Sequence, residues 1–396
     1  MNLLEQAKSI ASDLIEMRRD LHRHPELAFQ EVRTAEMVAE ALNDLGYRVQ
    51  TEIAITGVVA DLDNGTGPKV ALRADMDALP IQEINTHDFV SVNPGVMHAC
   101  GHDAHVAGLI GAAKLLSKER EEGRLPPGSV RLIFQPSEES TDTEGKSGAM
   151  RMVEEGVMKG VTAIIGLHII SILPSGKIFF RAGPLMAGSE EIHIEVLGQS
   201  SHAAQPDLGV DALSLAAQGI TETHQAVSDD LSPTESGVLT FGKIEGGTAN
   251  NVLADRVTIE GTMRFFSEEV RDRLCRCLET SFNMLKASGA EVNIRIGPGY
   301  LPVINNPQVT EWVQDAAIDL VGDDAKIPVD PTTLAEDFSF LGREAPSTFF
   351  FLGAALPEPR MHHRPDFRID ESVIPIATAT LAAGAIRILQ EMNKKG

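Results

Sequence analysis

The first half of the chain alternates between helical and strand patterns of apolar residues. Residues 2–23 carry apolar side chains at helical spacing, and similar patterns cover 32–45, a segment directly after Cys100, and 149–155. Short apolar segments between these helices have the length of strands, and they cover residues 57–62, 70–74, 130–134 and 161–166. Short apolar strands separated by helices predict a mostly parallel sheet that is covered by helices on both faces, an α/β fold.

The order of elements changes between residues 188 and 297. Residues 191–197 alternate strictly between apolar and polar side chains, as in a half-buried strand. The following patterns predict a helix over 211–227, strands over 237–245 and 256–265, a helix from the N-cap Ser267 to Gly289, and a strand over 291–296. This β-α-β-β-α-β order is the ferredoxin-like plan.

The chain then returns to the α/β pattern, with helices over 309–321 and 371–392 and a strand over 347–352. A chain of 396 residues exceeds the size at which single cores stop growing. We therefore predict a larger domain of residues 1–187 and 298–396, interrupted by a compact inserted domain of residues 188–297.

Composition restricts the possible partners. The formal net charge of -23 repels phosphate backbones and anionic lipids, which argues against nucleic acid and membrane partners. We find neither a signal segment nor an apolar run of the ~20 residues that a membrane span needs. The three cysteines are too few for a disulfide framework, so we expect the reducing cytoplasm as the location.

The segment of residues 97–105, Met-His-Ala-Cys-Gly-His-Asp-Ala-His, concentrates metal-binding side chains at the start of an apolar helix. Buried polar groups need partners, and a metal ion satisfies several of them at once. The thiolate of Cys100 and the imidazole of His102 select zinc or a similar first-row metal. The alternative is a redox-active thiol with incidental histidines.

Other candidate groups follow predicted strands. Glu138 and Glu139 come directly after an apolar strand, His168 ends another, and His362 and His363 lie in a Pro-bearing loop. Active sites of open α/β sheets lie at the carboxyl ends of the strands. One carboxylate of a neighbouring pair can hold metal while the other takes a proton from water. Each group alone could be an ordinary surface residue, but together they predict a metal-dependent site.

At this point the chain resembles the aminoacylase/carboxypeptidase superfamily of dinuclear metallohydrolases. The similar branch contains hippurate hydrolases, N-acyl-amino-acid amidohydrolases and auxin-conjugate hydrolases. The resemblance covers essentially the whole chain and rests on motifs that occur in order: H-P-E-L (24–27), R-A-D-M-D-A-L-P (73–80), H-A-C-G-H-D-x-H (98–105), F-Q-P-x-E-E (134–139), G-L-H (166–168), S-H-A-A (201–204), G-T-A-N-N-V (247–252), G-T-M-R (261–264), E-D-F (336–338) and H-x-P-x-F (363–367).

The resemblance implies a metallopeptidase-type catalytic domain with two divalent metal ions per subunit, which could be zinc, manganese, cobalt or nickel. The implied metal ligands are Cys100, His102, Glu139, His168 and His363. His363 is preferred to His362 because it alone completes H-x-P-x-F, and Glu138 is the implied general base. Asp77 and Asp103 are expected to orient the ligands.

The inserted domain is implied to serve for dimerisation or as a lid. His202 would stabilise the oxyanion, either across a dimer interface or after domain closure. Asn251 and Arg264 would hold the free carboxylate of the substrate. A homodimer or homotetramer is therefore expected. The alternative for His202 is a structural histidine that caps the helix beginning near residue 211.

The implied activity is hydrolysis of the amide bond of N-acyl amino acids. One alternative is a dipeptidase or carboxypeptidase on the same scaffold, and another is a metal-dependent binding protein with a dormant site. Two segments depart from the family pattern. Residues 140–148 are longer and more polar than the usual glycine run, and residues 169–172 lack the usual aromatic residue. Both are expected to border the acyl pocket, so the acyl group is left open.

Overall fold

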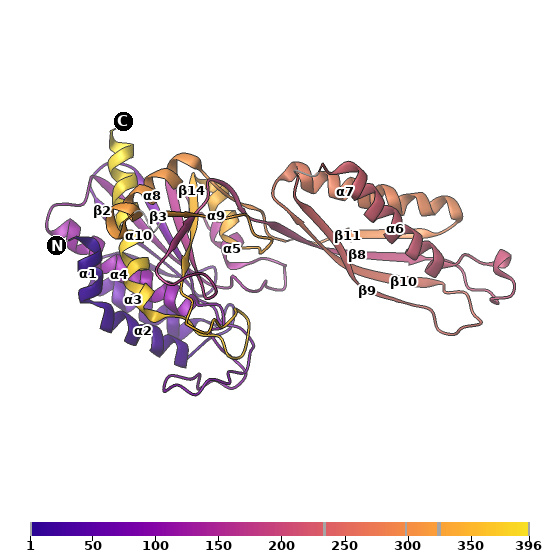
Figure 1. Cartoon of the computed structure of the whole chain (residues 1–396), viewed down its shortest axis with the longest axis horizontal. Helices are drawn as coiled ribbons and strands as arrows, with labels where there is room; N and C mark the ends of the chain where they lie inside the picture. The colour runs from indigo at the N-terminus through magenta and orange to yellow at the C-terminus, as the bar shows by residue number, and fades with distance from the viewer. Residues whose placement is uncertain (1, 233–234, 298, 323–325, 395–396) are drawn as a thin grey trace. The chain divides into compact units, whose positions relative to one another are not determined.

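The computed structural model describes residues 2–232, 235–297, 299–322 and 326–394. The chain divides into two compact units (Figure 1). The first unit contains Met1–Gly183, Ile304–Asp330 and Asp337–Gly396, and the second contains Pro184–Val303 and Pro331–Glu336. The sequence pattern did not indicate that the short segment Pro331–Glu336 belongs to the second unit.

The first unit is built on an eight-stranded sheet with the order β1-β2-β4-β3-β5-β14-β6-β13. The four neighbouring strands β4, β3, β5 and β14 run parallel, whereas β1 and β2 add antiparallel strands at one edge. The mostly parallel sheet is therefore confirmed. The strands are β1 (Arg48–Ile53), β2 (Gly57–Asn64), β3 (Lys69–Asp75), β4 (Gly128–Gln135), β5 (Ala163–Ile170), β6 (Ile178–Phe180), β13 (Lys326–Pro328) and β14 (Ser347–Gly353).

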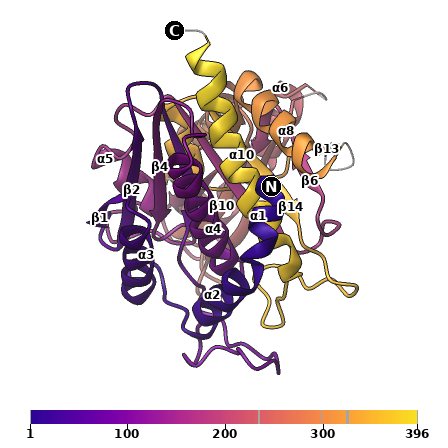
Figure 2. The ribbon, with the colours of Figure 1, turned by 90° about the vertical axis from the view of Figure 1, so that its left-hand side faces the viewer.

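Helices cover this sheet, and Figure 2 shows α3, α4, α10 and α8 side by side on one face. The short helices α5 and α9 pack against each other and against strands of the sheet. The helices are α1 (Leu3–Ser9), α2 (Ala11–Arg23), α3 (Val32–Asp44), α4 (His102–Glu121), α5 (Gly148–Glu154), α8 (Pro307–Val321), α9 (Phe338–Glu344) and α10 (Ile374–Asn393), the last preceded by the 3₁₀ turn η4 (Glu371–Val373). The single helix predicted over 2–23 is interrupted at Ile10, whose ψ of 8° is not helical.

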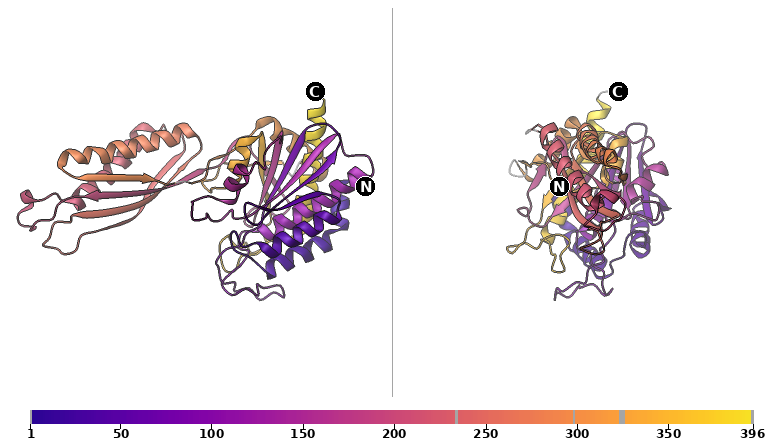
Figure 3. Two further views of the ribbon diagram at one scale, coloured as in Figure 1. Left: turned by 180° about the vertical axis from the view of Figure 1, so that it is seen from behind. Right: turned by 90° about the vertical axis from the view of Figure 1, so that its right-hand side faces the viewer.

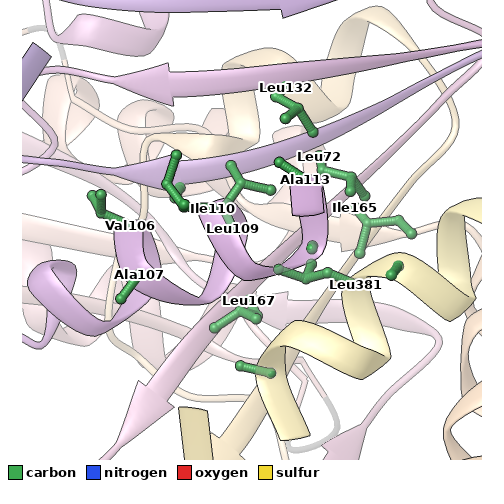
Figure 4. Packing of buried hydrophobic residues seen from close by; sticks show 14 of the residues in the cluster. Leu72, Val106, Ala107, Leu109, Ile110, Ala113, Leu132, Ile165, Leu167 and Leu381 are labelled. Atoms are coloured by element: carbon green, nitrogen blue, oxygen red, sulfur yellow. The ribbon is translucent and has the colours of Figure 1, made fainter. Parts of the chain in front are cut away.

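The core of the first unit lies between the sheet and helices α4 and α10. Figure 4 shows Leu109 and Ile110 of α4 and Leu381 of α10 directed toward Leu72 and Ile165 of the sheet. The segment Glu371–Asn393 is long and apolar enough to cross a membrane by length and mean hydropathy alone. Because 78% of its most apolar window is buried within the fold, it has the packing of a core helix.

The second unit has a four-stranded antiparallel sheet with the order β11-β8-β10-β9 and two helices on one face (Figure 3, left). The elements are β8 (Gly188–Leu197), η1 (Pro206–Leu208), α6 (Ala212–Asp230), β9 (Gly237–Gly246), β10 (Arg256–Phe265), α7 (Glu268–Asn283), η2 (Met284–Ser288) and β11 (Glu291–Ile296). Their order is the predicted β-α-β-β-α-β. Strands β7 (Gly183–Met186) and β12 (Val303–Asn305), where the chain passes between the units, form a two-stranded sheet.

Alternation along β8 explains the one-sided packing of this sheet. Ile192, Ile194 and Val196 are buried against the helices, whereas the polar residues between them are more exposed. Ser267 caps α7 by accepting a hydrogen bond from the amide of Val270, as predicted.

Candidate metal centre

The carboxyl ends of the parallel strands bring the predicted ligands of the first unit together. His102 is the first residue of α4, which follows β3, and His168 lies near the end of β5. Gly101 precedes the helix with a φ of 95°, a conformation that suits glycine, and it separates Cys100 from His102. The Sγ atom of Cys100 lies 3.4 Å from Nε2 of His168. Cys100, His102 and His168 are buried, and their ligand atoms lie within 4.8 Å of one another.

Two more triplets overlap with this one. Cys100, Glu139 and His363 form a second triplet, in which Nε2 of His363 lies 3.0 Å from Oε1 of Glu139. His102, Glu138 and Glu139 form the third. The structure thus brings all five predicted ligands and the predicted base into one cluster. Cys100 belongs to the first two triplets, so its sulfur lies within 4.8 Å of the ligand atoms of both.

The donor set of the cluster fits a cation. Nε2 of His102 is fully buried and has no hydrogen-bond partner among the described residues. Oδ2 of Asp75 lies 3.7 Å and Oε1 of Glu139 lies 3.9 Å from this nitrogen. Although burial lowers the pKa of His102, the carboxylates of Asp75 and Asp77 raise it to about 10. The site therefore holds excess negative charge that a divalent ion would neutralise.

The protonation of the other ligands depends on burial. Burial, followed by the carboxylates of Glu139 and Glu138, holds the pKa of the Cys100 thiol well above its usual range. A metal ion that binds Cys100 would therefore have to displace the proton of the thiol. Burial and the neighbouring His105 hold the pKa of His168 well below its usual range. His168 is consequently a neutral imidazole, as a metal ligand must be.

Asp77 contacts two of the predicted ligands at once. Its Oδ1 atom and its carbonyl oxygen lie 3.2 and 2.9 Å from Nδ1 of His102. Its Oδ2 atom accepts a hydrogen bond of 3.0 Å from the amide of Glu139. Since Nδ1 of His102 is engaged, the free Nε2 faces the cluster, which is the usual arrangement behind a metal-bound imidazole.

Asp103 lies in a different buried network. Its Oδ2 atom lies 2.9 Å from Nε of Arg18 and 2.7 Å from Nδ1 of His22. The expected contact with a ligand imidazole is absent among the described interactions of Asp103. The other nitrogen of His22 reaches Glu83, which also lies 3.2 Å from His87. The ligand atoms of His22, Glu83 and His87 are close enough together to hold a metal ion. The guanidinium of Arg18, however, already supplies positive charge to this network.

A fully buried network of motif residues supports the strand ends. Oδ1 of Asp75 lies 2.6 Å from Nδ1 of His105, and Nε2 of His105 accepts a hydrogen bond of 2.9 Å from the amide of Ile169. Arg73 donates to Asp75 and to Asp337. The network therefore fixes the residue that follows His168. All four side chains lie in motifs of the sequence, R-A-D-M-D-A-L-P, H-A-C-G-H-D-x-H and E-D-F, but the motifs do not show that these side chains contact one another.

His362 has a backbone partner. Its Nε2 atom accepts a hydrogen bond of 3.0 Å from the amide of Ser171, and its Nδ1 atom lies 3.7 Å from Sγ of Cys100. Burial and His363 lower the pKa of His362 to about 3. The half-exposed ring of His363, in contrast, reaches Glu139. These contacts fit His362 as an anchor of the loop and His363 as the ligand.

The two departures from the family pattern differ in structure. In the loop after Glu139, the side chain of Asp142 accepts hydrogen bonds from the amides of Glu144 and Lys146 and pairs with Arg151. The side chain of Asp142 therefore holds this loop together and attaches it to α5. After His168, the chain instead exposes an aliphatic side chain, since Ile172 is 51% exposed.

The predicted substrate-binding residues of the second unit lie at two ends of its sheet. The segments of His202 and Asn251 pair with each other beyond the ends of β8 and β10, where the amide of Ala203 donates to the carbonyl of Asn251. Arg264 lies near the other end of β10, opposite Ser189 of β8. Arg264 lies eight positions after Arg256 in β10, which corresponds to about 25 Å along the strand.

Side-chain contacts in the second unit bear on the predicted roles. The exposed His202 accepts a hydrogen bond from the amide of Ala204 through Nδ1. It does not cap α6, because Asp211 accepts the amide hydrogen bonds at that helix start. Arg264 is half-buried and donates to Oγ1 of Thr262 and to the carbonyl of Met263. Burial lowers the pKa of Arg264, and no carboxylate lies within ion-pair distance of it among the described residues.

A mostly buried cluster of thiol, imidazole and carboxylate groups, at the strand ends of an α/β sheet, is typical of the site of a metal-dependent hydrolase. The chain belongs to peptidase family M20/M25/M40, whose profile matches residues 71–387. It is a metal-dependent hydrolase that acts on amide bonds, as its relatives indicate.

Three comparisons illustrate this membership. The chain is 43% identical over 298 residues to the N-acyl-L-amino acid amidohydrolase of Geobacillus stearothermophilus, which covers 75% of this chain and 79% of that protein. It is 37% identical over 392 residues to IAA-amino acid hydrolase ILR1-like 5 of Arabidopsis thaliana, and the match covers 96% of this chain and 87% of that protein. The crystal structure of the YXEP protein of Bacillus subtilis, a dinuclear metal-binding peptidase, superimposes with a TM-score of 0.82 at 33% sequence identity. The match covers 97% of this chain and 99% of that chain.

Proposed function

We propose that this protein hydrolyses the amide bond of N-acyl amino acids and that Glu138 is its general base. The observation that carries the proposal is the position of Glu138 in one triplet with His102 and Glu139, directly beside the thiol-containing ligand cluster. Relatives named as an N-acyl-L-amino acid amidohydrolase and an IAA-amino acid hydrolase support the substrate class.

The chain supplies a base and a set of ligands. We assign Cys100, His102, Glu139, His168 and His363 as the ligands of two divalent ions, which would polarise the scissile carbonyl and acidify the attacking water. Glu138, only 6% exposed, takes the proton of that water and delivers it to the leaving amine. The thiol among the ligands needs reducing surroundings, which supports the cytoplasm as the location.

The second unit supports a role for two copies of the chain. An N-acyl amino acid is about as long as two extended residues, or about 7 Å. His202 and Arg264 of one chain are separated along their sheet by more than about 25 Å, so they cannot contact the same substrate molecule. Arg264 suits the carboxylate because its planar fork has no acidic partner among the residues that the structure describes. We therefore propose a homodimer in which His202 and Asn251 act on the substrate of the partner chain.

Mixed dimers test this arrangement. Glu138→Ala and His202→Ala chains with different tags are co-expressed, and the mixed dimer is purified through both tags. One of its two sites then combines an intact base with an intact His202 from the partner, so about half of the wild-type turnover per dimer is expected. An inactive mixed dimer, or no mixed dimer at all, would contradict the proposal. The two homodimeric variants serve as controls.

A substrate panel tests the activity itself. Chelated protein is reloaded with zinc, manganese, cobalt or nickel and assayed with N-acetyl, N-benzoyl and indole-acetyl amino acids, with free dipeptides as the comparison. We expect metal-dependent release of the free amino acid from the N-acylated compounds. Preference for dipeptides would indicate a dipeptidase, and no turnover with any metal would indicate a dormant binding protein.

A further inference from the structure

Glu31 is a fully buried carboxyl group that connects the start of α3 to the loop carrying the predicted base. Its Oε1 atom accepts a hydrogen bond of 2.9 Å from the amide of Ser137. Its Oε2 atom lies 2.5 Å from Oγ1 of Thr56, which donates to it. The link to Ser137 spans 106 positions of the sequence, so it is a tertiary contact rather than part of a local turn.

Ser137 occupies a conformation that needs support. Its φ of 47° is in the left-handed region, which costs a non-glycine residue about 1 kcal/mol or more. Its carbonyl accepts a hydrogen bond from the amide of Gly148, and its hydroxyl donates to the carbonyl of Ser140. Both partners belong to the same loop region. The bond from Ser137 to Glu31 therefore ties this turn to the start of α3.

The two glutamates after Ser137 are held in different ways. The amide of Glu139 donates to Asp77, which also orients His102, so Glu139 has its own support. Glu138 follows Ser137 directly, and the backbone torsions of Ser137 set the direction in which Glu138 leaves the strand end. A change at Ser137 should consequently redirect Glu138, whereas the bond to Asp77 still holds Glu139.

The surroundings of Glu31 argue against a role in fold stability alone, because burial of its carboxyl group is unfavourable. No basic side chain lies within ion-pair distance of Glu31 among the described residues, although its carboxyl group is buried. Burying a carboxyl group without a cation costs free energy that an apolar or amide side chain would not cost. Burial and the nearby carboxylate of Asp77 raise the pKa of Glu31 to about 7, in agreement with this cost.

We propose that Glu31 is a positioning residue that holds the left-handed turn at Ser137 and thereby aims the carboxylate of Glu138. The inference rests on the proposed function of Glu138 as the base. It assigns to Glu31 no contact with substrate or metal.

Two substitutions at Glu31 and one matched control test the inference. Glu31→Ala removes both hydrogen bonds, whereas Glu31→Gln keeps an acceptor for the amide of Ser137 at nearly the same size. Glu26→Ala is the control because Glu26 also accepts two backbone hydrogen bonds, from the amides of Arg33 and Thr34, but these stabilise the start of α3 only. Metal content, kcat, KM and thermal unfolding are measured on each metal-loaded protein.

We expect Glu31→Ala to retain its metal and to lower kcat about tenfold or more, with KM changed by less than about twofold. Glu31→Gln should restore kcat to within about threefold of wild type. Glu26→Ala should lower the melting temperature with kcat close to wild type. Wild-type kcat in Glu31→Ala, or an equal loss of kcat in Glu26→Ala, would overturn the inference.

A crystal structure of metal-loaded Glu31→Ala gives a readout that does not depend on turnover. The inference predicts that Ser137 leaves the left-handed region and that the Glu138 carboxylate moves while Glu139 stays in place. An unchanged Ser137 turn would overturn it. Inactivity of the wild-type protein on every substrate would instead refute the proposed function, so the two failures are distinguishable.

Discussion

Replacing Glu31 by glutamine should remove a pH-dependent loss of stability from the metal-free protein. The buried carboxyl group of Glu31 binds its proton more tightly in the folded chain than in the unfolded chain, because burial and Asp77 raise its pKa from 4.5 to about 7. Glutamine has nearly the same shape, retains an acceptor for Ser137, and does not titrate. It therefore resembles the protonated form of Glu31 at every pH.

The magnitude follows from the rise in pKa. An increase from 4.5 to about 7 corresponds to about 3 kcal/mol of folding free energy. Because the folded state holds the proton more tightly, stability is unaffected below pH 4.5 and falls as the pH rises from there to about 7. Above that range the full penalty is present in the wild-type protein and absent in Glu31→Gln.

Urea denaturation of chelated protein at about pH 5 and about pH 8 measures the effect. The free energy of unfolding of Glu31→Gln, relative to wild type, should increase by about 2–3 kcal/mol between the two conditions. Glu26→Gln controls for the general effect of replacing a carboxylate that is bonded to backbone amides. A constant difference between Glu31→Gln and wild type at both pH values would refute the reasoning.

Two further predictions concern the thiol and the core. Bound metal should protect Cys100 from iodoacetamide, whereas chelated protein should be alkylated there as the pH is raised; equal rates with and without metal would argue against thiolate ligation. Gly111→Ala should destabilise the fold by about 1–3 kcal/mol in thermal melts, because its added Cβ would lie 2.5 Å from Oγ1 of Thr378. Gly108→Ala on the same helix meets Ala377 at 3.4 Å and should be neutral or stabilising by up to about 1 kcal/mol.

The fold was most predictable where one face of an element is buried. In β8 the alternation of Ile192, Ile194 and Val196 with polar residues identified both the strand and its buried face. Strand β1 was missed because Arg48–Ile53 lies at the sheet edge, is largely exposed and has only two apolar residues, Val49 and Ile53. The break at Ile10 was missed because the apolar spacing continues across it.

The candidate site was predictable only to the extent that its residues lie in motifs. The cluster around Cys100 and Glu139 follows from strand ends that meet at one edge and from family resemblance. The supports of the cluster depend on contacts between distant segments, such as that of Glu31 with Ser137 and that of His105 with Ile169. Linear spacing carries no information about such contacts. For the same reason Asp103, which lies beside His102 in sequence, was expected to orient a ligand but contacts Arg18 and His22.

The central claim is that Glu138 and Glu139 divide the roles of base and ligand in a site for two metal ions. Elemental analysis combined with turnover of an N-acyl amino acid on Glu138→Ala and Glu139→Ala tests it most directly. The account predicts that Glu138→Ala keeps the wild-type metal content and loses turnover by at least ~100-fold, whereas Glu139→Ala also loses metal. Metal loss in Glu138→Ala with full metal content in Glu139→Ala would contradict the account.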